Sequence, residues 1–279
     1  MPEADLQREI ALLREEVRRL RSSLTRLTPS LPVLLRRRGF RVYKKEPSED
    51  LLIPQAGHIE GYYGMLRRYS FRLFLRDVIK HRPRFTLHDV TRYATREVTS
   101  EYIAYLVETG LALPEKGGYR LINGPIRSFG ETLEWFLAEI FKREFASEAI
   151  WGVKMKRPGV GGDYDLLAKI DGAILVMEVK SSPPRQVYQN EIRSFFDRSC
   201  DLMPELALFF MDTELRMKDK IVPMFEEELK RRFPQPPEIK RLEKELFEVQ
   251  TEKPRVFIIN AKDSIIANIE KVLAEYFRG

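Results

Sequence analysis

The stretch GGDYDLLAKIDGAILVMEVK, residues 161–180, decides the fold of the C-terminal half of this 279-residue chain. Its centre holds Asp171-Gly172, a dipeptide that strongly favours a tight turn between two antiparallel strands. A two-residue turn at this position fixes the register of the flanking strands and places Asp165 directly opposite Glu178. The stretch therefore predicts a β-hairpin with two carboxylates side by side.

The same register places Asp163 opposite Lys180. Because side chains two residues apart share one face of a strand, these two residues join Asp165 and Glu178 on a single face. The opposite face is apolar and is predicted to be core: Tyr164, Leu166, Ala168, Leu175, Met177 and Val179.

Two carboxylates directly across a strand pair repel each other, so a nearby cation must offset their charge. The chain has three histidines and one cysteine, which makes a zinc site improbable. Oxygen ligands favour Mg²⁺ or Mn²⁺. The alternative is a purely structural cluster of Asp, Glu and Lys at the end of a sheet.

The pattern of Asp165, twelve intervening residues and Glu178-Val179-Lys180 resembles the PD-(D/E)XK nuclease superfamily, which includes Holliday-junction resolvases and Mrr-type restriction enzymes. The resemblance covers about residues 130–210, where a preceding helix and a following helix and strand match the core order of that family. It implies that Asp165 and Glu178 bind the metal with the Val179 carbonyl, and that Lys180 positions or deprotonates the attacking water.

The resemblance also implies a glutamate on the helix before the hairpin. Glu134, at the edge of the apolar arc in GETLEWFLAEIF, fits better than Glu131. In the family a proline precedes the metal-binding aspartate, but no proline stands before either aspartate here. Asp163 is therefore a second candidate metal ligand, either in place of Asp165 or together with it.

Relatives often carry a glutamine at the start of the next helix. Gln186 and Gln189 are both candidates for that position, and Gln189 is expected among the nucleic-acid-binding residues. Arg185, in the loop after the lysine, is a candidate phosphate contact.

Residues 125–279 are thus expected to form an α/β domain with a mixed sheet and an αβββαβ core similar to restriction endonucleases. The expected helices are 129–145, 187–202, 215–232, 237–249 and 263–277, and the expected strands are 149–155, 163–169, 173–180, 206–211 and 256–260.

Residues 57–124 resemble the winged-helix family. We expect a helix over 60–80, a second helix capped by Thr86, and a third opened by Thr99 and ended by Gly110. A hairpin turn at residues 115–118 would follow.

The chemistry of this middle region is mixed. Its third helix carries Glu97, Glu101 and Glu108, which phosphate would repel, while a basic stripe lies on the first helix. The candidate nucleic-acid contacts are Arg68, Arg72, Arg76 with Lys80 beside them, and Lys116 in the hairpin turn. The region is either a DNA-binding domain or a module that docks a protein partner.

Residues 1–28 show a heptad repeat. The apolar positions are Leu6, Ile10, Leu13, Val17, Leu20, Leu24 and Leu27. This spacing predicts a parallel two-stranded coiled coil, and hence a homodimer. The alternative is one amphipathic helix packed on its own domain. Residues 29–56 are expected to be a basic linker, in which RRRGFRVYKK (36–45) either contacts DNA or forms an edge strand.

The formal net charge of +6 is compatible with a nucleic-acid partner. The single cysteine excludes a disulfide framework, and neither a long apolar run nor a signal-peptide pattern is present. We therefore expect a cytoplasmic protein without membrane spans.

Together these features predict a metal-dependent endonuclease that acts on duplex or branched DNA as a dimer. One alternative is a non-catalytic DNA-binding scaffold with a nuclease-like domain, and another is a nuclease that cuts RNA. The sequence leaves the substrate structure, endo- or exonucleolytic cutting and the need for a partner open.

Overall fold

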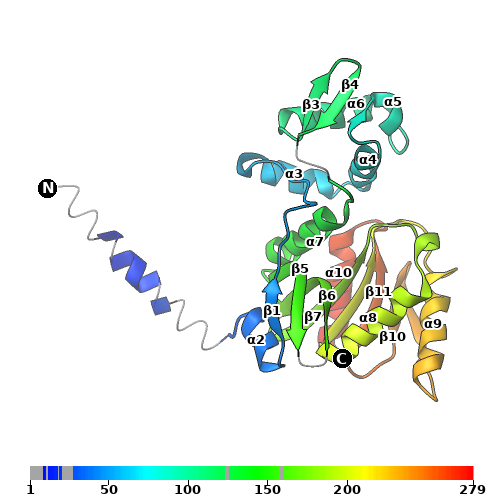
Figure 1. Ribbon diagram of the computed structural model, residues 1–279. Coiled ribbons are helices and arrows are strands. Elements are labelled where there is room, and N and C mark those ends of the chain that lie inside the picture. The colour runs from blue at the N-terminus through cyan, green and yellow to red at the C-terminus, as the bar shows by residue number, and fades with distance from the viewer. Residues whose placement is uncertain are drawn as a thin grey trace.

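The computed structural model describes residues 9–10, 12–17, 19–20, 28–122, 126–157 and 160–278. It contains a large α/β part built on an eight-stranded sheet and a smaller, mainly helical part with a three-stranded sheet (Figure 1). Within the described residues, no helix has the length and apolar character needed to cross a membrane.

The large sheet is mixed. Its strands, in spatial order, are β1 (Arg41–Lys44), β5 (Glu148–Arg157), β6 (Val160–Ile170), β7 (Ala173–Lys180), β8 (Leu206–Met211), β11 (Arg255–Asn260), β10 (Leu246–Val249) and β9 (Ile239–Glu243). The central strands β7, β8 and β11 run parallel, and the remaining neighbours are antiparallel. The expected mixed α/β fold is confirmed.

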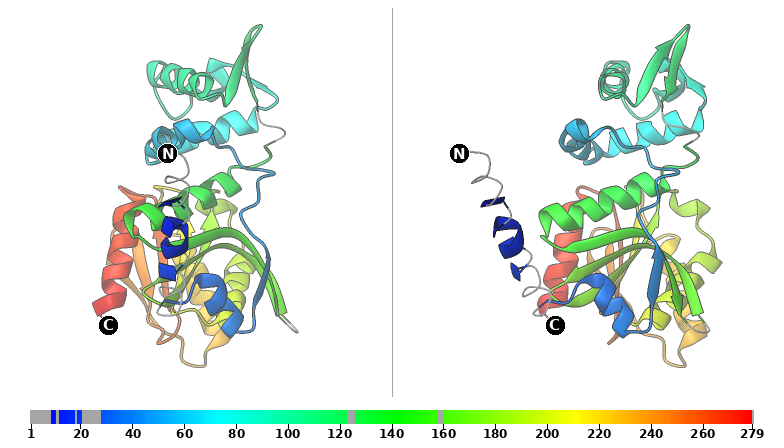
Figure 2. Two further views of the ribbon diagram at one scale, coloured as in Figure 1. Left: turned by 90° about the vertical axis from the view of Figure 1, so that its left-hand side faces the viewer. Right: turned by 60° about the vertical axis from the view of Figure 1, so that its left-hand side comes forward.

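Helices cover both faces of this sheet (Figure 2). One core cluster joins the sheet to α7 (Gly130–Glu144) and α10 (Ile265–Arg278). A second cluster, on the other face, joins it to α2 (Leu31–Arg37), α8 (Gln189–Leu202) and α9 (Ile221–Arg232). The described residues also include two short 3₁₀ helices, η1 (Ala56–His58) and η2 (Pro184–Gln186). The chain order α7, β5, β6, β7, α8, β8 is the αβββαβ order expected from the sequence.

The helix expected over 237–249 is wrong, because this segment forms the hairpin β9–β10. The Glu- and Lys-rich sequence favours a helix locally. However, Phe247 pairs with Ile258 of β11 and is buried in the core, so sheet pairing overrides the local propensity.

The segment expected as a linker, 29–56, also differs. Leu31, Leu35 and Phe40 are buried in the core, and β1 pairs with β5 and forms one edge of the large sheet. Of the two alternatives for the basic stretch 36–45, the structure therefore shows the edge strand, which follows α2.

The smaller part contains α3 (Ile59–Leu66), α4 (Tyr69–Lys80), β2 (Arg84–Phe85), α5 (Leu87–Val90), α6 (Arg96–Glu108), β3 (Ala112–Glu115) and β4 (Gly118–Leu121). The single helix expected over 60–80 is broken at Arg67-Arg68, where Arg68 is extended. The break lets Tyr62 of α3 pack on Trp135 of α7, while Phe71 of α4 packs on Tyr102 of α6.

Local signals in this part were only partly correct. Thr86 caps α5 in a capping box with Asp89, as expected. The third helix begins at Arg96 and not at Thr99, because Thr95 supplies the N-cap. With the first expected helix divided into α3 and α4 and the short strand β2 added, the order otherwise follows the sequence interpretation. The winged-helix assignment itself stays a prediction.

The N-terminal heptads lie partly outside the described residues. Residues 9–10, 12–17 and 19–20 are helical, and this helix stands apart from the body of the protein (Figure 1). The described heptad residues Ile10, Leu13, Val17 and Leu20 are exposed in the single chain. Coiled-coil dimerisation stays a prediction.

Candidate active site

The β6–β7 hairpin has the register expected from its turn. Ile170 pairs with Ala173, and the ladder continues regularly to Leu166 and Met177. The described strand pairing ends there, one residue before Asp165 would pair with Glu178. The Asp165 carboxylate instead accepts a hydrogen bond of 2.7 Å from the Val179 N–H. It therefore lies where β6 and β7 separate.

Gly152 of β5 lies opposite Asp165 and changes the direction of side chains along the sheet. Its φ is +55°, a left-handed conformation that favours glycine. On one side of it Trp151 belongs to the core under α7, and on the other Val153 belongs to the core under α8. The alternation of side chains between faces is therefore interrupted at the level of Asp165.

This interruption overturns two expectations. Tyr164 packs in the core under α8, whereas the other residues of its expected apolar face pack under α7. Asp163 does not join Asp165: its side chain is 67% exposed and pairs at 2.9 Å with Lys154 of β5. The prediction of Asp163 as a metal ligand therefore has no support in the geometry.

Glu178 and Lys180 do lie together at the end of β7. Lys180 Nζ contacts Glu178 Oε1 at 2.8 Å and Glu191 Oε1 of α8 at 2.9 Å. The other Glu178 oxygen, Oε2, accepts a hydrogen bond from Arg198 of α8. Glu178 is only 6% exposed, so two cations hold a nearly buried carboxylate.

Glu134 of α7 points at the same place. The Gly152 N–H donates to its carboxylate, and the charges of Asp165 and Glu178 act on it. Glu131, the alternative considered from the sequence, accepts a hydrogen bond of 2.9 Å from the Asp50 N–H, and its charge also acts on Glu134. Of the two glutamates, the structure brings Glu134 to the site.

Burial and neighbouring negative charges make the ionised form of two carboxylates in this cluster unfavourable. Burial, followed by the charge of Glu178, raises the pKa of Asp165 well above its usual range. Burial and the charge of Asp165 raise the pKa of Glu134 as well. Burial alone would lower the pKa of Lys180, but the charge of Glu178 and hydrogen bonds to Glu178 and Glu191 raise it to about 12. Lys180 is therefore a cation at neutral pH.

A divalent cation fits the donors of this cluster. Four carboxylates face two cationic side chains: Glu134, Asp165, Glu178 and Glu191 against Lys180 and Arg198. Full ionisation would leave two negative charges in excess, and oxygen donors are the ligands Mg²⁺ and Mn²⁺ prefer. Among the described residues no group of three or more His, Cys, Asp or Glu side chains is placed to hold a metal. The metal-ligand set implied by the family resemblance needs only two carboxylates, those of Asp165 and Glu178, together with the Val179 carbonyl.

The remaining predicted contacts are scattered. Arg68, Lys116 and Arg185 are exposed on separate elements. Gln189 donates its amide to the Met224 carbonyl of α9 at 2.9 Å, so that group is directed at a neighbouring helix. Gln186, the other candidate, lies in η2 and is exposed.

The expected basic stripe on α4 is not a solvent-facing stripe. Arg72 is 1% exposed, and its guanidinium pairs at 2.9 Å with Asp212, which is fully buried after β8. Arg76 pairs with the same carboxylate. Arg72 is thus removed from the expected nucleic-acid contacts because it joins the two parts of the molecule.

Sequence reasoning missed Glu191, Arg198 and Asp212. Glu191 and Arg198 are seven residues apart, so they share one face of α8, and this spacing could have linked them to the end of β7. No local signal marked Asp212, because its partners are 136 and 140 residues away.

Fold and site together define an α/β protein with a carboxylate and lysine cluster where two central strands separate. No family model matches the sequence, and no curated protein matches it. Among solved structures, the chain is similar to the protein VC1899 from Vibrio cholerae, with a TM-score of 0.45 and 17% identity over 69% of this chain and 54% of that one. It is also similar to Can2 from Sulfobacillus thermosulfidooxidans, solved in complex with cyclic tetra-adenylate, with a TM-score of 0.40 and 17% identity over 65% of this chain and 50% of that one. The chain thus spans about half the length of either structure. At these TM-scores neither protein indicates a function for this chain.

Proposed function

We propose that the protein is a metal-dependent nuclease that hydrolyses phosphodiester bonds. The observation that carries this proposal is the cluster of Asp165, Glu178 and Lys180 at the point where β6 and β7 separate. Three charged side chains, held by backbone and side-chain contacts, meet there with an excess of negative charge. Carboxylates in excess of the neighbouring cations are costly to keep ionised, and a bound divalent metal ion would relieve that cost.

In the proposed reaction Asp165 and Glu178 would hold Mg²⁺ or Mn²⁺ with the Val179 carbonyl, and Glu134 lies close to both carboxylates. A bound divalent ion would supply charge stabilisation and lower the pKa of a water molecule. Lys180, fixed between Glu178 and Glu191, orients the attacking water by hydrogen bonding and offsets the charge of the phosphate. The half-buried site limits the screening of these charges by solvent.

The proposed substrate is DNA, cut endonucleolytically by a homodimer that the N-terminal heptads assemble. The net charge of +6 supports a polyanionic partner. A second candidate, a DNA-binding scaffold without catalysis, is favoured by one observation. Lys180 and Arg198 already neutralise Glu178, and this arrangement would suit a site that never receives a metal. In either case the smaller part is a candidate surface for DNA or a protein partner.

Cleavage of labelled single-stranded, duplex, flap and four-way-junction DNA, and of duplex RNA, with Mg²⁺ or Mn²⁺ tests the proposal. We expect Asp165→Asn and Lys180→Met to cut slower by about 10²-fold or more, because the first weakens a proposed metal ligand and the second removes the group that orients the water. Asp163→Asn is the matched control, because this carboxylate is on the same strand but exposed.

Equal loss in Asp163→Asn would show that the wrong carboxylate has been assigned. Binding of DNA by wild-type protein without any metal-dependent cutting would favour the scaffold. Preferential cutting of RNA would correct the substrate.

A further inference from the structure

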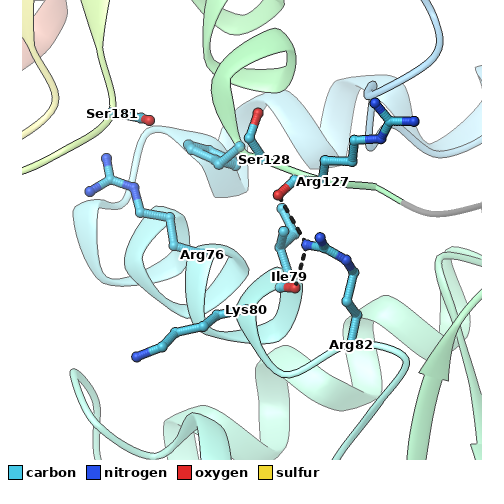
Figure 3. Close-up of a pocket in the computed structure, with 8 residues that line it drawn as sticks. Arg76, Ile79, Lys80, Arg82, Arg127, Ser128 and Ser181 are labelled. Atoms are coloured by element: carbon cyan, nitrogen blue, oxygen red, sulfur yellow. Dashed lines mark hydrogen bonds between the residues drawn. The ribbon is translucent and has the colours of Figure 1, made fainter.

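A cleft of about 440 Å³ opens between α4 and the segment that leads into α7. The lining side chains that matter are Arg76, Lys80, Arg82, Arg127, Ser128 and Ser181 (Figure 3). Four of these six are cations, and none of the residues that line the cleft is acidic. The cations come from both sides of the junction between the two parts of the molecule.

The charges behind the cleft are also unbalanced. Arg72 and Arg76 share the single buried carboxylate of Asp212. In addition, the buried Nε of Arg76 has no hydrogen-bond partner among the described residues. An arginine that is partly buried and incompletely paired favours a further anion nearby.

Two acidic residues near the cleft do not cancel this excess. Asp50 accepts hydrogen bonds from the backbone N–H of Arg127 and from the Ser128 hydroxyl, and not from the lining guanidinium groups. Asp77 is 6% exposed, and burial raises its pKa, which disfavours its charged form. Lys80 and Arg127 are exposed, and no ion pair is recorded for either side chain in the described part of the chain.

The backbone also adds positive electrostatic potential to the cleft. Ser128 and Phe129 line the cleft immediately before α7, a 15-residue helix that begins at Gly130. The N-terminal end of a helix carries a partial positive charge, which favours an anion. The Arg76 guanidinium lies over the Phe129 ring at 5.6 Å, which keeps it on this wall of the cleft.

The cleft adjoins the candidate active site along the chain. Ser181 follows Lys180 directly, so their Cα atoms are about 3.8 Å apart. The lining of the cleft therefore begins one residue after Lys180, at the end of β7. That proximity suits successive groups of one polynucleotide strand.

We infer that this cleft binds a backbone phosphate of the nucleic-acid strand that the active site cuts. This inference rests on the proposed nuclease function and deepens it by giving the strand a path. The strand would pass from the end of β7 across the junction to α4. Cations from both parts would then hold it, so the smaller part would contribute to substrate binding through α4.

The test uses the full chain with Lys80→Gln and Arg127→Gln combined. Its matched control is Lys230→Gln with Lys240→Gln, which removes the same charge at exposed positions on α9 and β9. Binding of labelled duplex DNA is measured with EDTA present, so that no cutting occurs, over a series of salt concentrations. We expect weaker binding, and a slope of log K against log salt that falls by about 1–2 in the cleft variant alone.

An unchanged slope in the cleft variant, or an equal fall in the control, would overturn the inference. Titration with inorganic phosphate and with AMP, followed by thermal unfolding, separates a polynucleotide from a small ligand. Stabilisation by AMP or phosphate that is lost in the cleft variant, while DNA binding is not, would also overturn it.

Parallel cleavage assays keep the two proposals apart. If wild-type protein cuts DNA and the cleft variant binds it normally, the cleft assignment fails alone. If DNA binding depends on the cleft but wild-type protein does not cut DNA, the phosphate-binding cleft is supported and the proposed nuclease activity is contradicted.

Discussion

Two charge clusters, one partly buried and one buried, lie at the ends of neighbouring strands, and they differ in how their charges are satisfied. At the end of β7, Asp165 and Glu178 share Lys180 and Arg198 with further carboxylates. Just after β8, the single carboxylate of Asp212 has two arginines. The clusters are joined directly, because the Asp212 N–H donates to the Lys180 carbonyl at 2.8 Å.

This difference separates a structural role from a functional one. The carboxylate of Asp212 is fully paired and connects the two parts of the protein. At the end of β7, by contrast, burial and the repulsion between carboxylates raise the pKa values of Asp165 and Glu134, so the cluster costs stability when no metal ion is bound. Sites that bind ligands commonly carry such local costs.

The largest expected effect on stability is at the Asp212 cluster. Arg72→Met removes one partner of a buried ion pair and should lower the free energy of unfolding by about 3–5 kcal/mol. Urea denaturation measures this, with exposed Lys80→Met on the same helix as the control, expected within about 0.5 kcal/mol of wild type. A double-mutant cycle of Arg72→Met with Asp212→Asn should show strong coupling, and additive effects would contradict the structural role.

Asp165→Asn should change the free energy of unfolding in the opposite direction and stabilise the protein. Its amide oxygen can still accept the Val179 hydrogen bond, while the repulsion with Glu178 and Glu134 is removed. We expect stabilisation by about 0.5–2 kcal/mol in metal-free buffer, together with loss of cleavage. Asp163→Asn is again the control. Destabilisation by Asp165→Asn would mean that this carboxylate is structural, as Asp212 is.

The raised pKa values predict a pH dependence of stability in the metal-free protein. A carboxyl group whose pKa is raised by folding contributes stability below its ordinary pKa, near 4. That contribution is lost as pH rises through the raised values. The free energy of unfolding should therefore fall with pH, by up to about 1.4 kcal/mol per pH unit and proton. Denaturation from acidic to alkaline pH checks this, and Glu134→Gln should flatten the slope; an equal slope in this variant would place the titration elsewhere.

The smallest expected effect concerns Arg198, which competes with a metal for Glu178. Arg198→Gln should tighten Mn²⁺ binding several-fold, because a partly exposed ion pair contributes at most about 1 kcal/mol. Calorimetric titration with Mn²⁺ measures the change. Arg193→Gln, on the same helix and 52% exposed, is the control. Unchanged or weaker Mn²⁺ binding in Arg198→Gln would show that Arg198 does not compete.

Much of the site was predictable because it depends on local sequence. The turn at Asp171-Gly172 sets the strand register, and that register explains why Asp165, Glu178 and Lys180 come together. The family resemblance implied a glutamate on the preceding helix, and the edge of the apolar face of that helix favoured Glu134. The prediction failed for Asp163 and Tyr164 because it assumed that side chains alternate regularly between the two faces of a strand. The backbone opposite Asp165 is not regular, since Gly152 has a positive φ.

The sequence by itself determined the α/β class, the order of α7 to β8 and the three charged residues at the centre of the candidate site, because turn signals and hydrophobic periodicity act over a few residues. Only the tertiary structure decided that Arg72 is buried, that β9 and β10 are strands, and that basic groups from both parts line one cleft. These outcomes depend on partners distant in the chain, such as Asp212 for Arg72 and Ile258 for Phe247. Local propensity carries no information about such partners, and the burial they provide outweighs it.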